Sequence, residues 1–576
     1  MLSKVDTFFL AHINDTHSHF DETLLPLKLM TAEGVQQVRL ACGGFSRLQT
    51  FIQQARQKAR TENTEFLFLD AGDSFQGTLY YSCFEGKANA ELLNRIGIDA
   101  MVVGNHELDT GNDALAHFVR AVNFPVLAAN WDLSSEAEDK PTRLHGLPNM
   151  VSYQNPAHPQ PYMVKMAGHT PIAIFGLMLD SMSDIAAPDP DSRFLSVLSS
   201  ARRIISEIQQ AGIQHIILLS HLGYDRDCQL AQEVSGISMI IGGHTHTLQG
   251  DFSQLGLANQ HPYGAQSGNT IVVQAGYNAL MAGLSKIALL PNGTMQIIEG
   301  QNYLLTSDDA TLVQQNGQPM SERRIQRCRN FIAAQTNIAR VQPDIAMDAF
   351  IENNYRCKLH QFSHDQVVSL PKGLRHIRIP DAIGGSQIAP LVAESMLFQA
   401  KQMGVHIDVA IFNAGGARIS LPPGPVTAAE LAGRLLPFAS TISYFSVKGI
   451  QLRLALEGAI VNALEQGGSG SFPYPASLRY HYTEHLPRGQ RVHGVEVKNA
   501  FGQWFVLDEM ADYRLITTSY TALGKEGYHA LLESRSKPEL LGPIISDAFI
   551  NYARAKGVLF PQNEDLFRLE LKQLAS

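Results

Sequence analysis

Short apolar runs that alternate with amphipathic segments fill the first three hundred residues, and this alternation constrains the fold most. Each run ends at a polar residue or a glycine, as buried strands do. The runs are VDTFFLAHIND, EFLFLDAGD, AMVVGNHELD, FPVLAAN, PIAIFGL, QHIILLSHLG and SMIIGGHTH. Between them, GFSRLQTFIQQARQKAR and SSARRIISEIQQAG have apolar residues at helical spacing. The pattern predicts a layered α/β architecture whose helices cover the faces of the sheet.

The pattern changes after residue 305, and 576 residues are too many for a single core. We predict a first domain over 1–305, a connector with a linker helix over 306–370, and a second domain over 371–576. The connector helix is expected in SERRIQRCRNFIAAQTNIARV. The second domain again reads as α/β, with a helix in IAPLVAESMLFQAKQMG and a strand in HIDVAIFNAGGAR that runs into a glycine-rich turn.

Composition excludes several classes of protein. Hydrophobic residues make up 45% and charged residues 17% of the chain, which is typical of a packed globular protein. The net charge of −9 disfavours binding to a nucleic-acid polymer. No apolar run approaches the roughly 20 residues that span a bilayer, and FFLAHI is too short for a signal peptide. We therefore expect no membrane partner and a cytoplasmic location, or a periplasmic or secreted one if a leader precedes this sequence.

Polar side chains follow five of the predicted strands. In the Asp-x-His and His-x-His patterns the two side chains point to the same side of an extended backbone and can reach one inorganic cluster. Carboxylate, imidazole and amide groups together suit a borderline divalent ion rather than calcium. Any one element alone is more often structural, but all five together indicate a metal site. The residues are Asp15, His17, Asp73, Asn105, His106, His221, His244 and His246.

The order D-x-H, GD, GNHE, SH and GHTH resembles the calcineurin-like metallophosphoesterases. LDAGDSFQGT and VVGNHELDTG are similar to the 5′-nucleotidase branch of that family. The resemblance implies a four-layer α/β/β/α sandwich followed by an α/β nucleotide-recognition domain. It also implies two divalent ions, with manganese, zinc, iron and cobalt left open. Asp15, His17, Asp73 and His246 would hold one ion, and Asp73, Asn105, His221 and His244 would hold the other, so that Asp73 bridges them.

His106 and Asp109 are expected to act beside the metals rather than on them. Two cations about 3.5–4 Å apart clamp an in-line phosphoryl displacement and lower the pKa of a bridging water, which makes hydroxide available. Asp109 would orient His106 and keep it protonated, so that the imidazolium stabilises the charge that develops on the phosphate. The alternative is that Asp109 only caps the following helix.

The second domain resembles the 5′-nucleotidase C-terminal domain, which implies a set of substrate-binding residues. FNAGGARIS matches the family's Asn-Gly-rich-Arg turn, in which glycine allows close approach of a ligand and arginine offers paired donors. LLPFAS and SYTALGKEGY resemble family segments that stack on the base and hold the ribose, although the family usually has Phe and Asp where this chain has Tyr520 and Glu526. Without the family, the two aromatic residues would be assigned to the core. The implied residues are Arg375, Arg378, Asn413, Gly415, Gly416, Arg418, Phe438, Tyr520 and Glu526.

The resemblance implies hydrolysis of nucleoside 5′-monophosphates. Hydrolysis of UDP-sugars or other nucleotide diphosphates, and of 2′,3′-cyclic nucleotides, remain alternatives within the same family. A non-catalytic nucleotide-binding protein is disfavoured because every expected ligand is present. A thiosulfate-ester hydrolase is disfavoured by the nucleoside-type turn NAGGAR.

Overall fold

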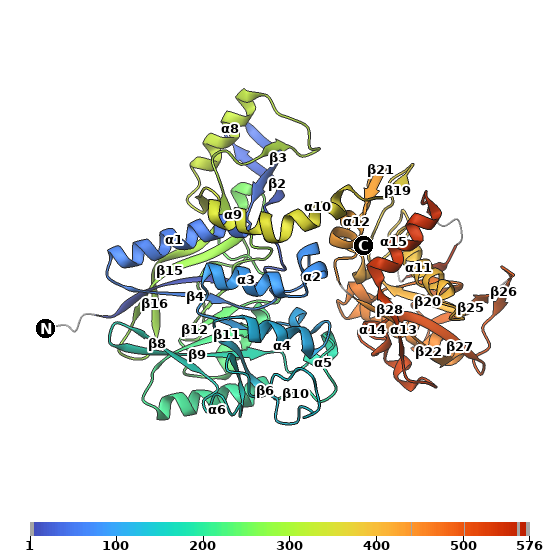
Figure 1. The fold of residues 1–576 in the computed structure, drawn as a ribbon, viewed down its shortest axis with the longest axis horizontal. Coiled ribbons are helices and arrows are strands. Elements are labelled where there is room, and N and C mark those ends of the chain that lie inside the picture. The colour runs from blue at the N-terminus through green and yellow to red at the C-terminus, as the bar shows by residue number, and fades with distance from the viewer. Residues whose placement is uncertain (1–4, 439, 500, 562–564, 572–576) are drawn as a thin grey trace. The chain divides into compact units, whose positions relative to one another are not determined.

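The computed structural model describes residues 5–438, 440–499, 501–561 and 565–571 (Figure 1). Its contacts divide the chain into two units. Unit 1 contains the described residues up to Gln76 together with Cys83–Cys357. Unit 2 contains Gly77–Ser82 and the described residues from Lys358 onward. The second division point lies inside the segment 306–370.

Two sheets form the centre of unit 1. The order of the larger sheet is β10 (Arg193–Phe194), β6 (Val126–Asp132), β5 (Ala100–Val102), β4 (Glu65–Asp70), β1 (Thr7–Ile13), β15 (Met281–Leu289), β16 (Met295–Thr306) and β18 (Ile338–Arg340), with β7 (Met150–Tyr153) beside β6. The order of the second sheet is β13 (Ala265–Ser267), β14 (Thr270–Val273), β12 (Met239–Gly242), β11 (His215–His221), β9 (Thr170–Met178) and β8 (Met163–Ala167).

Helices cover the outer faces of both sheets, so that unit 1 has four layers. Leu10 and Leu69 of the first sheet share a buried core with Ile174 and Leu219 of the second. The other face of the second sheet packs on α6 (Val197–Gln210) and α7 (Tyr224–Glu233). The first sheet is covered by α1 (Phe45–Thr61), which contacts α3 (Lys87–Ile96), and α3 contacts α4 (Asn112–Ala121). The predicted α/β/β/α sandwich is confirmed.

The seven apolar runs all form strands, namely β1, β4, β5, β6, β9, β11 and β12. Antiparallel additions were not predicted. They include the long pair β15–β16 and a separate three-stranded sheet in the order β17 (Leu312–Gln314), β3 (Gly34–Cys42) and β2 (Thr23–Thr31). Exposed and buried residues alternate along much of β2. In the sequence of β2, Pro26 and Lys28 interrupt the apolar residues, and a proline argues against a strand interior.

A mixed five-stranded sheet organises unit 2, as an α/β domain should. Its order is β23 (Pro473–Ala476), β20 (Val409–Asn413), β27 (Asp512–Thr518), β22 (Thr441–Lys448) and β28 (Glu539–Ile544). The helices α11 (Ala389–Gln402), α13 (Gly449–Glu465) and α15 (Ile545–Lys556) share one core with this sheet. Smaller sheets are β26 (Trp504–Val506), β25 (Val492–Lys498), β24 (Leu478–Thr483) and β29 (Phe567–Glu570), and the pair β19 (Gln366–Leu370) and β21 (Gly424–Thr427).

A helix forms where the linker helix was predicted, as α8 (Glu322–Ala333), but it lies within unit 1 and contacts β2 and β18. After β18, α9 (Ile345–Ile351) leads into a π-helical turn, η3 (Glu352–Arg356). Across the described residues, no helix combines the length and the apolar character needed to cross a membrane.

Candidate functional site

The predicted metal ligands gather at the carboxyl ends of the parallel strands of unit 1, where α/β sheets place their sites. β1, β4, β5, β11 and β12 each supply residues at their ends or in the following loops. The side chains form three groups, and within each group the ligating atoms all lie within 4.8 Å of one another. The groups are Asp15, His17 and His246; Asp73, His221 and His244; and His17, Asp73 and His106.

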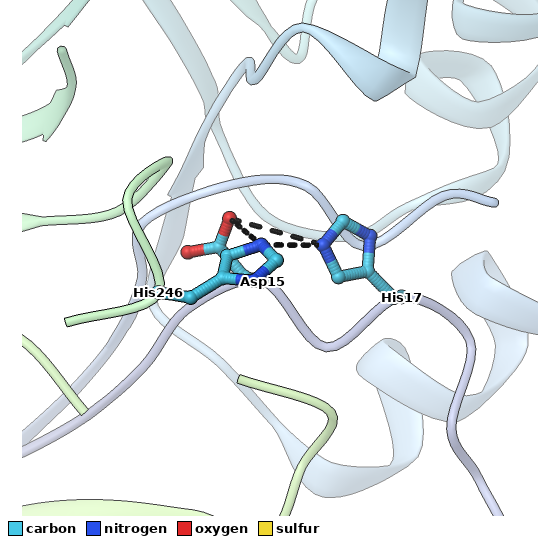
Figure 2. Close-up of side chains that lie close together, drawn as sticks. All are labelled: Asp15, His17 and His246. Carbon is cyan, nitrogen blue, oxygen red and sulfur yellow. Dashed lines mark hydrogen bonds and ion pairs between the residues drawn. The ribbon is translucent and has the colours of Figure 1, made fainter. Parts of the chain in front are cut away.

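The first group brings two imidazoles to one carboxylate (Figure 2). The Nε2 of His246 lies 3.3 Å from Oδ1 of Asp15 and 3.0 Å from Nε2 of His17. Burial, together with the neighbouring His106, lowers the pKa of His17 to about 3, so the ring is neutral. A neutral imidazole and a carboxylate that face one point are donors for a cation.

In the second group a buried imidazole nitrogen faces a carboxylate. His221 is fully buried, and its Nδ1 lies 2.7 Å from the carbonyl oxygen of Ala71. Its Nε2 lies 3.1 Å from Oδ2 of Asp73 but has no hydrogen-bond partner among the described residues. Burial would lower the pKa of His221, but Asp73 raises it to about 10. The negative charge of Asp73 favours a positive charge at this point. The arrangement therefore fits a divalent ion held by His221 and Asp73.

Five of the seven predicted ligands have a left-handed backbone although none of them is glycine. A non-glycine residue in this conformation costs about 1–3 kcal/mol and persists where the surroundings enforce it, as at functional sites. The residues and their φ values are Asp15 (50°), His17 (48°), Asp73 (55°), His244 (74°) and His246 (56°). Most of the predicted ligands therefore share a strained backbone as well as a location.

His106 and Asp109 form a close pair beside these groups. Nδ1 of His106 lies 2.6 Å from Oδ2 of Asp109, and its Nε2 lies 3.9 Å from Oδ2 of Asp73. Burial alone would lower the pKa of His106, but Asp109 and Asp73 raise it to about 9. His106 is therefore protonated at neutral pH. The following helix, α4, has Gly111 at its N-cap, so Asp109 does not cap it.

Glu107 was not predicted to have a role, although it stands inside the GNHE motif. Its side chain is fully buried and accepts four backbone N–H groups. Oε1 accepts from Ser74 (2.7 Å) and Phe75 (3.0 Å), and Oε2 accepts from Asp73 (3.0 Å) and Gly104 (2.8 Å). The carboxylate thus ties the loop after β4 to the loop after β5. The position of Glu107, a charged residue shortly after a buried strand, could have indicated this role.

In unit 2 the glycine-rich turn is tightly enclosed. A Cβ at Gly415 would lie 3.0 Å from Cα of Gly470, and a Cβ at Gly416 would lie 2.6 Å from the ring of Phe412. Only glycine fits at these positions without displacing a neighbour. Asn413, at the end of β20, is buried and its Oδ1 accepts from Thr521 Oγ1 at 3.5 Å.

Four further predicted residues of unit 2 lie near this turn. The guanidinium of Arg418 lies 5.4 Å from the centre of the Phe438 ring. Burial lowers the pKa of Arg418, and so does the positive charge of Arg378. Burial raises the pKa of Glu526, which Arg378 partly offsets. Two arginines, an acid and an aromatic ring are thus close to the turn.

The contacts of the other two predicted residues do not indicate a role in substrate binding. Nη1 of Arg375 donates to Oδ1 of Asp381 at 3.0 Å, so this arginine stabilises its own loop. Tyr520 is half-buried in the short helix α14 (Ser519–Ala522). Their roles toward substrate stay predictions.

Comparison with known proteins gives the family. The profile for calcineurin-like phosphoesterases matches residues 10–248, and the profile for the 5′-nucleotidase C-terminal domain matches residues 370–533. A protein of Treponema pallidum (strain Nichols) named probable 5′-nucleotidase is 33% identical over 552 residues, 91% of this chain and 87% of that protein. This chain belongs to the 5′-nucleotidase family. The predicted family membership is confirmed. The predicted enzyme class, a metal-dependent phosphoric ester hydrolase, is confirmed with it.

Two other members of the 5′-nucleotidase family are similar over most of their length. The NAD 5′-nucleotidase of Haemophilus influenzae is 29% identical over 559 residues, 92% of this chain and 87% of that protein. The solved structure of a 5′-nucleotidase precursor from Thermus thermophilus has a TM-score of 0.71 and 27% identity, and the match covers 98% of this chain and 99% of that one.

Proposed function

We propose that this 5′-nucleotidase family member removes the phosphate of nucleoside 5′-monophosphates with two divalent metal ions. The observation that carries the proposal is the presence of two separate ligand groups, Asp15–His17–His246 and Asp73–His221–His244, each with one carboxylate and two imidazoles. Asp73 also lies within ligating distance of His17, which supports its role as the bridge between the two ions. Asn105, whose Oδ1 lies 2.8 Å from Nδ1 of His244, completes the second group.

The mixed oxygen and nitrogen donors suit manganese, zinc, iron or cobalt. When bound, such ions supply Lewis acidity toward phosphoryl oxygens and lower the pKa of water. The chain itself supplies His106, whose proton on Nδ1 is held by Asp109 and whose Nε2–H faces the ligand cluster. This imidazolium donates a hydrogen bond to a phosphoryl oxygen as negative charge develops on it.

Unit 2 recognises the nucleoside in this proposal. The ring of Phe438 is partly exposed and suited to stacking on a base, and Glu526 accepts ribose hydroxyls. Arg378 and Arg418 add paired N–H donors for ribose or phosphate oxygens. The relatives named 5′-nucleotidase and NAD 5′-nucleotidase support a nucleotide as substrate.

A substrate panel tests the proposal. The chelator-treated protein is supplied with Mn²⁺, Co²⁺ or Zn²⁺ and given AMP, UDP-glucose, 2′,3′-cyclic AMP and NAD. We expect the highest kcat/KM with AMP, and no turnover before metal is added. A higher kcat/KM with UDP-glucose or with the cyclic nucleotide would replace the proposed substrate by that class. If no phosphate ester is hydrolysed with any of the three metals, the proposal is wrong.

A further inference from the structure

A cavity of about 330 Å³ lies in unit 1 directly beside the predicted ligand His246. Its volume is at the lower end of the range of about 300–1,000 Å³ that is typical of small-molecule sites. Its walls are mostly apolar, from Leu25, Leu248, Leu257 and Met281. Among the described residues that line it there is no Asp, Glu, Lys or Arg. The cavity therefore suits an uncharged group.

Tyr277 adds an aromatic wall to this cavity. Its ring stacks on the imidazole of His246 with the centroids 5.0 Å apart and the planes 16° from parallel, and the residue is 41% exposed. The residues that follow, Asn278 and Ala279, are both left-handed, with φ of 58° and 50°. The backbone N–H of Asn278 donates to the carbonyl oxygen of Asp15 at 2.8 Å. A strained loop anchored at the metal-ligand segment thus holds the tyrosine in place, as strained loops do at binding sites.

We propose that this cavity binds a planar aromatic group carried by a second substituent on the phosphate, as in aryl phosphodiesters and dinucleotides. The inference rests on the proposed function, because the cavity borders a predicted ligand of the metal centre. A phosphate monoester carries one organic substituent, and unit 2 is proposed to bind it. A phosphate diester or a dinucleotide carries a second organic substituent, which needs a binding site of its own. An apolar cavity without charged walls suits a ring, since a second phosphate or a bare sugar would leave polar groups without partners.

The reaction on such a substrate is a balanced hydrolysis. The oxygen of water bonds to phosphorus, one P–O bond breaks, and the departing oxygen takes a proton. The other substituent stays on phosphorus. Bis(p-nitrophenyl) phosphate would give p-nitrophenyl phosphate and p-nitrophenol, and no oxidant or reductant is needed.

Filling the cavity from its rim tests the proposal. Ala258 is exposed and lines the cavity, whereas the next residue, Asn259, is also exposed and does not line it. Ala258→Phe places a ring in the cavity without changing the core, and Asn259→Phe is the matched control. With Mn²⁺, we expect Ala258→Phe to raise KM for bis(p-nitrophenyl) phosphate about tenfold and to leave KM for AMP within about twofold. Asn259→Phe should change neither.

Binding to the chelator-treated protein gives a second readout that does not require turnover. Calorimetric titration with bis(p-nitrophenyl) phosphate should show binding to the unchanged protein and to Asn259→Phe, and a loss of about tenfold in affinity for Ala258→Phe. An unchanged affinity and KM in Ala258→Phe would overturn the cavity proposal, as would an equal loss on AMP. If AMP is not hydrolysed at all, the proposed function fails, while the titration still decides the cavity.

Discussion

At the scale of single residues, Glu107 organises the loops that carry the predicted ligands. Four backbone N–H groups converge on its buried carboxylate, and one of them belongs to Asp73. The N–H of His106 in turn donates to Oδ1 of Asp73 at 2.8 Å. A carboxylate has lone pairs for all four donors, whereas an amide presents its own N–H groups on one side.

Glu107→Gln should therefore weaken metal binding. Two backbone N–H groups would lose their acceptor, which costs about 1–3 kcal/mol for each buried group. We expect a lower melting temperature and a metal content clearly below that of the unchanged protein, measured by elemental analysis after dialysis. Glu65→Gln, at the exposed start of β4, is the control and should change neither quantity. Full metal content in Glu107→Gln would show that the carboxylate is not needed to position Asp73.

His106 and Asp73 should respond differently to substitution. His106→Ala removes one donor to the transition state, so kcat should fall by about 10²–10³ while metal content stays nearly intact. Asp73→Ala removes the carboxylate shared by two ligand groups and should abolish both metal binding and activity. His106 also lies in a group with His17 and Asp73. Loss of metal in His106→Ala would therefore show that His106 is a metal ligand and not only a hydrogen-bond donor.

At the scale of elements, the π-helical turn η3 is tied to the segment that follows the first two predicted ligands. Nη2 of Arg356 lies 2.6 Å from Oδ1 of Asp21 and 3.0 Å from Oδ1 of Asp348, and its Nη1 lies 2.9 Å from Oε2 of Glu352. One planar guanidinium thus joins η3, α9 and the loop after β1. Networks of this kind are worth more than isolated surface pairs.

Arg356→Ala should lower the free energy of unfolding by about 1–2 kcal/mol, because three carboxylates lose a shared partner. Urea unfolding measures the effect. Arg340→Ala is the control, since Nη1 of Arg340 lies 2.7 Å from Oδ1 of Asp308 and both of these side chains are well exposed. A change no larger than that of the control would show that the network adds nothing.

The sequence allowed the strands of the sandwich to be predicted because their apolar runs are continuous, as in FFLAHI and IILLSH. It did not allow β2 or β16 to be predicted, because exposed and buried residues mix along them. The motifs also identified side chains that the fold brings within ligating distance. The stacking of Tyr277 and the left-handed φ values were not predicted. A stacking partner that is distant in sequence and a strained backbone leave no pattern in a single sequence.

At the scale of the whole molecule, the two units offer separate reporters. The chain contains two tryptophans, the buried Trp131 in unit 1 and Trp504 in unit 2. All predicted metal ligands belong to unit 1. Metal binding stabilises the state that binds it, by about 2.7 kcal/mol at a concentration one hundred times Kd.

Mn²⁺ should therefore raise the melting temperature reported by Trp131 and leave that reported by Trp504 nearly unchanged. Fluorescence melting of Trp504→Phe and of Trp131→Phe, each with Mn²⁺ and with chelator, separates the two signals. Equal shifts in both variants would mean that the units unfold together, and no shift in either would contradict metal binding in unit 1.

The left-handed backbone at five predicted ligands has a consequence for protein engineering. Glycine adopts this conformation without a steric cost, so the backbone at Asp15, His17, Asp73, His244 and His246 would relax if glycine replaced them. A selection that rewards heat resistance alone favours such relief, and it would remove the side chains that are predicted to bind metal. Directed evolution of this enzyme therefore needs activity as a second criterion in every round.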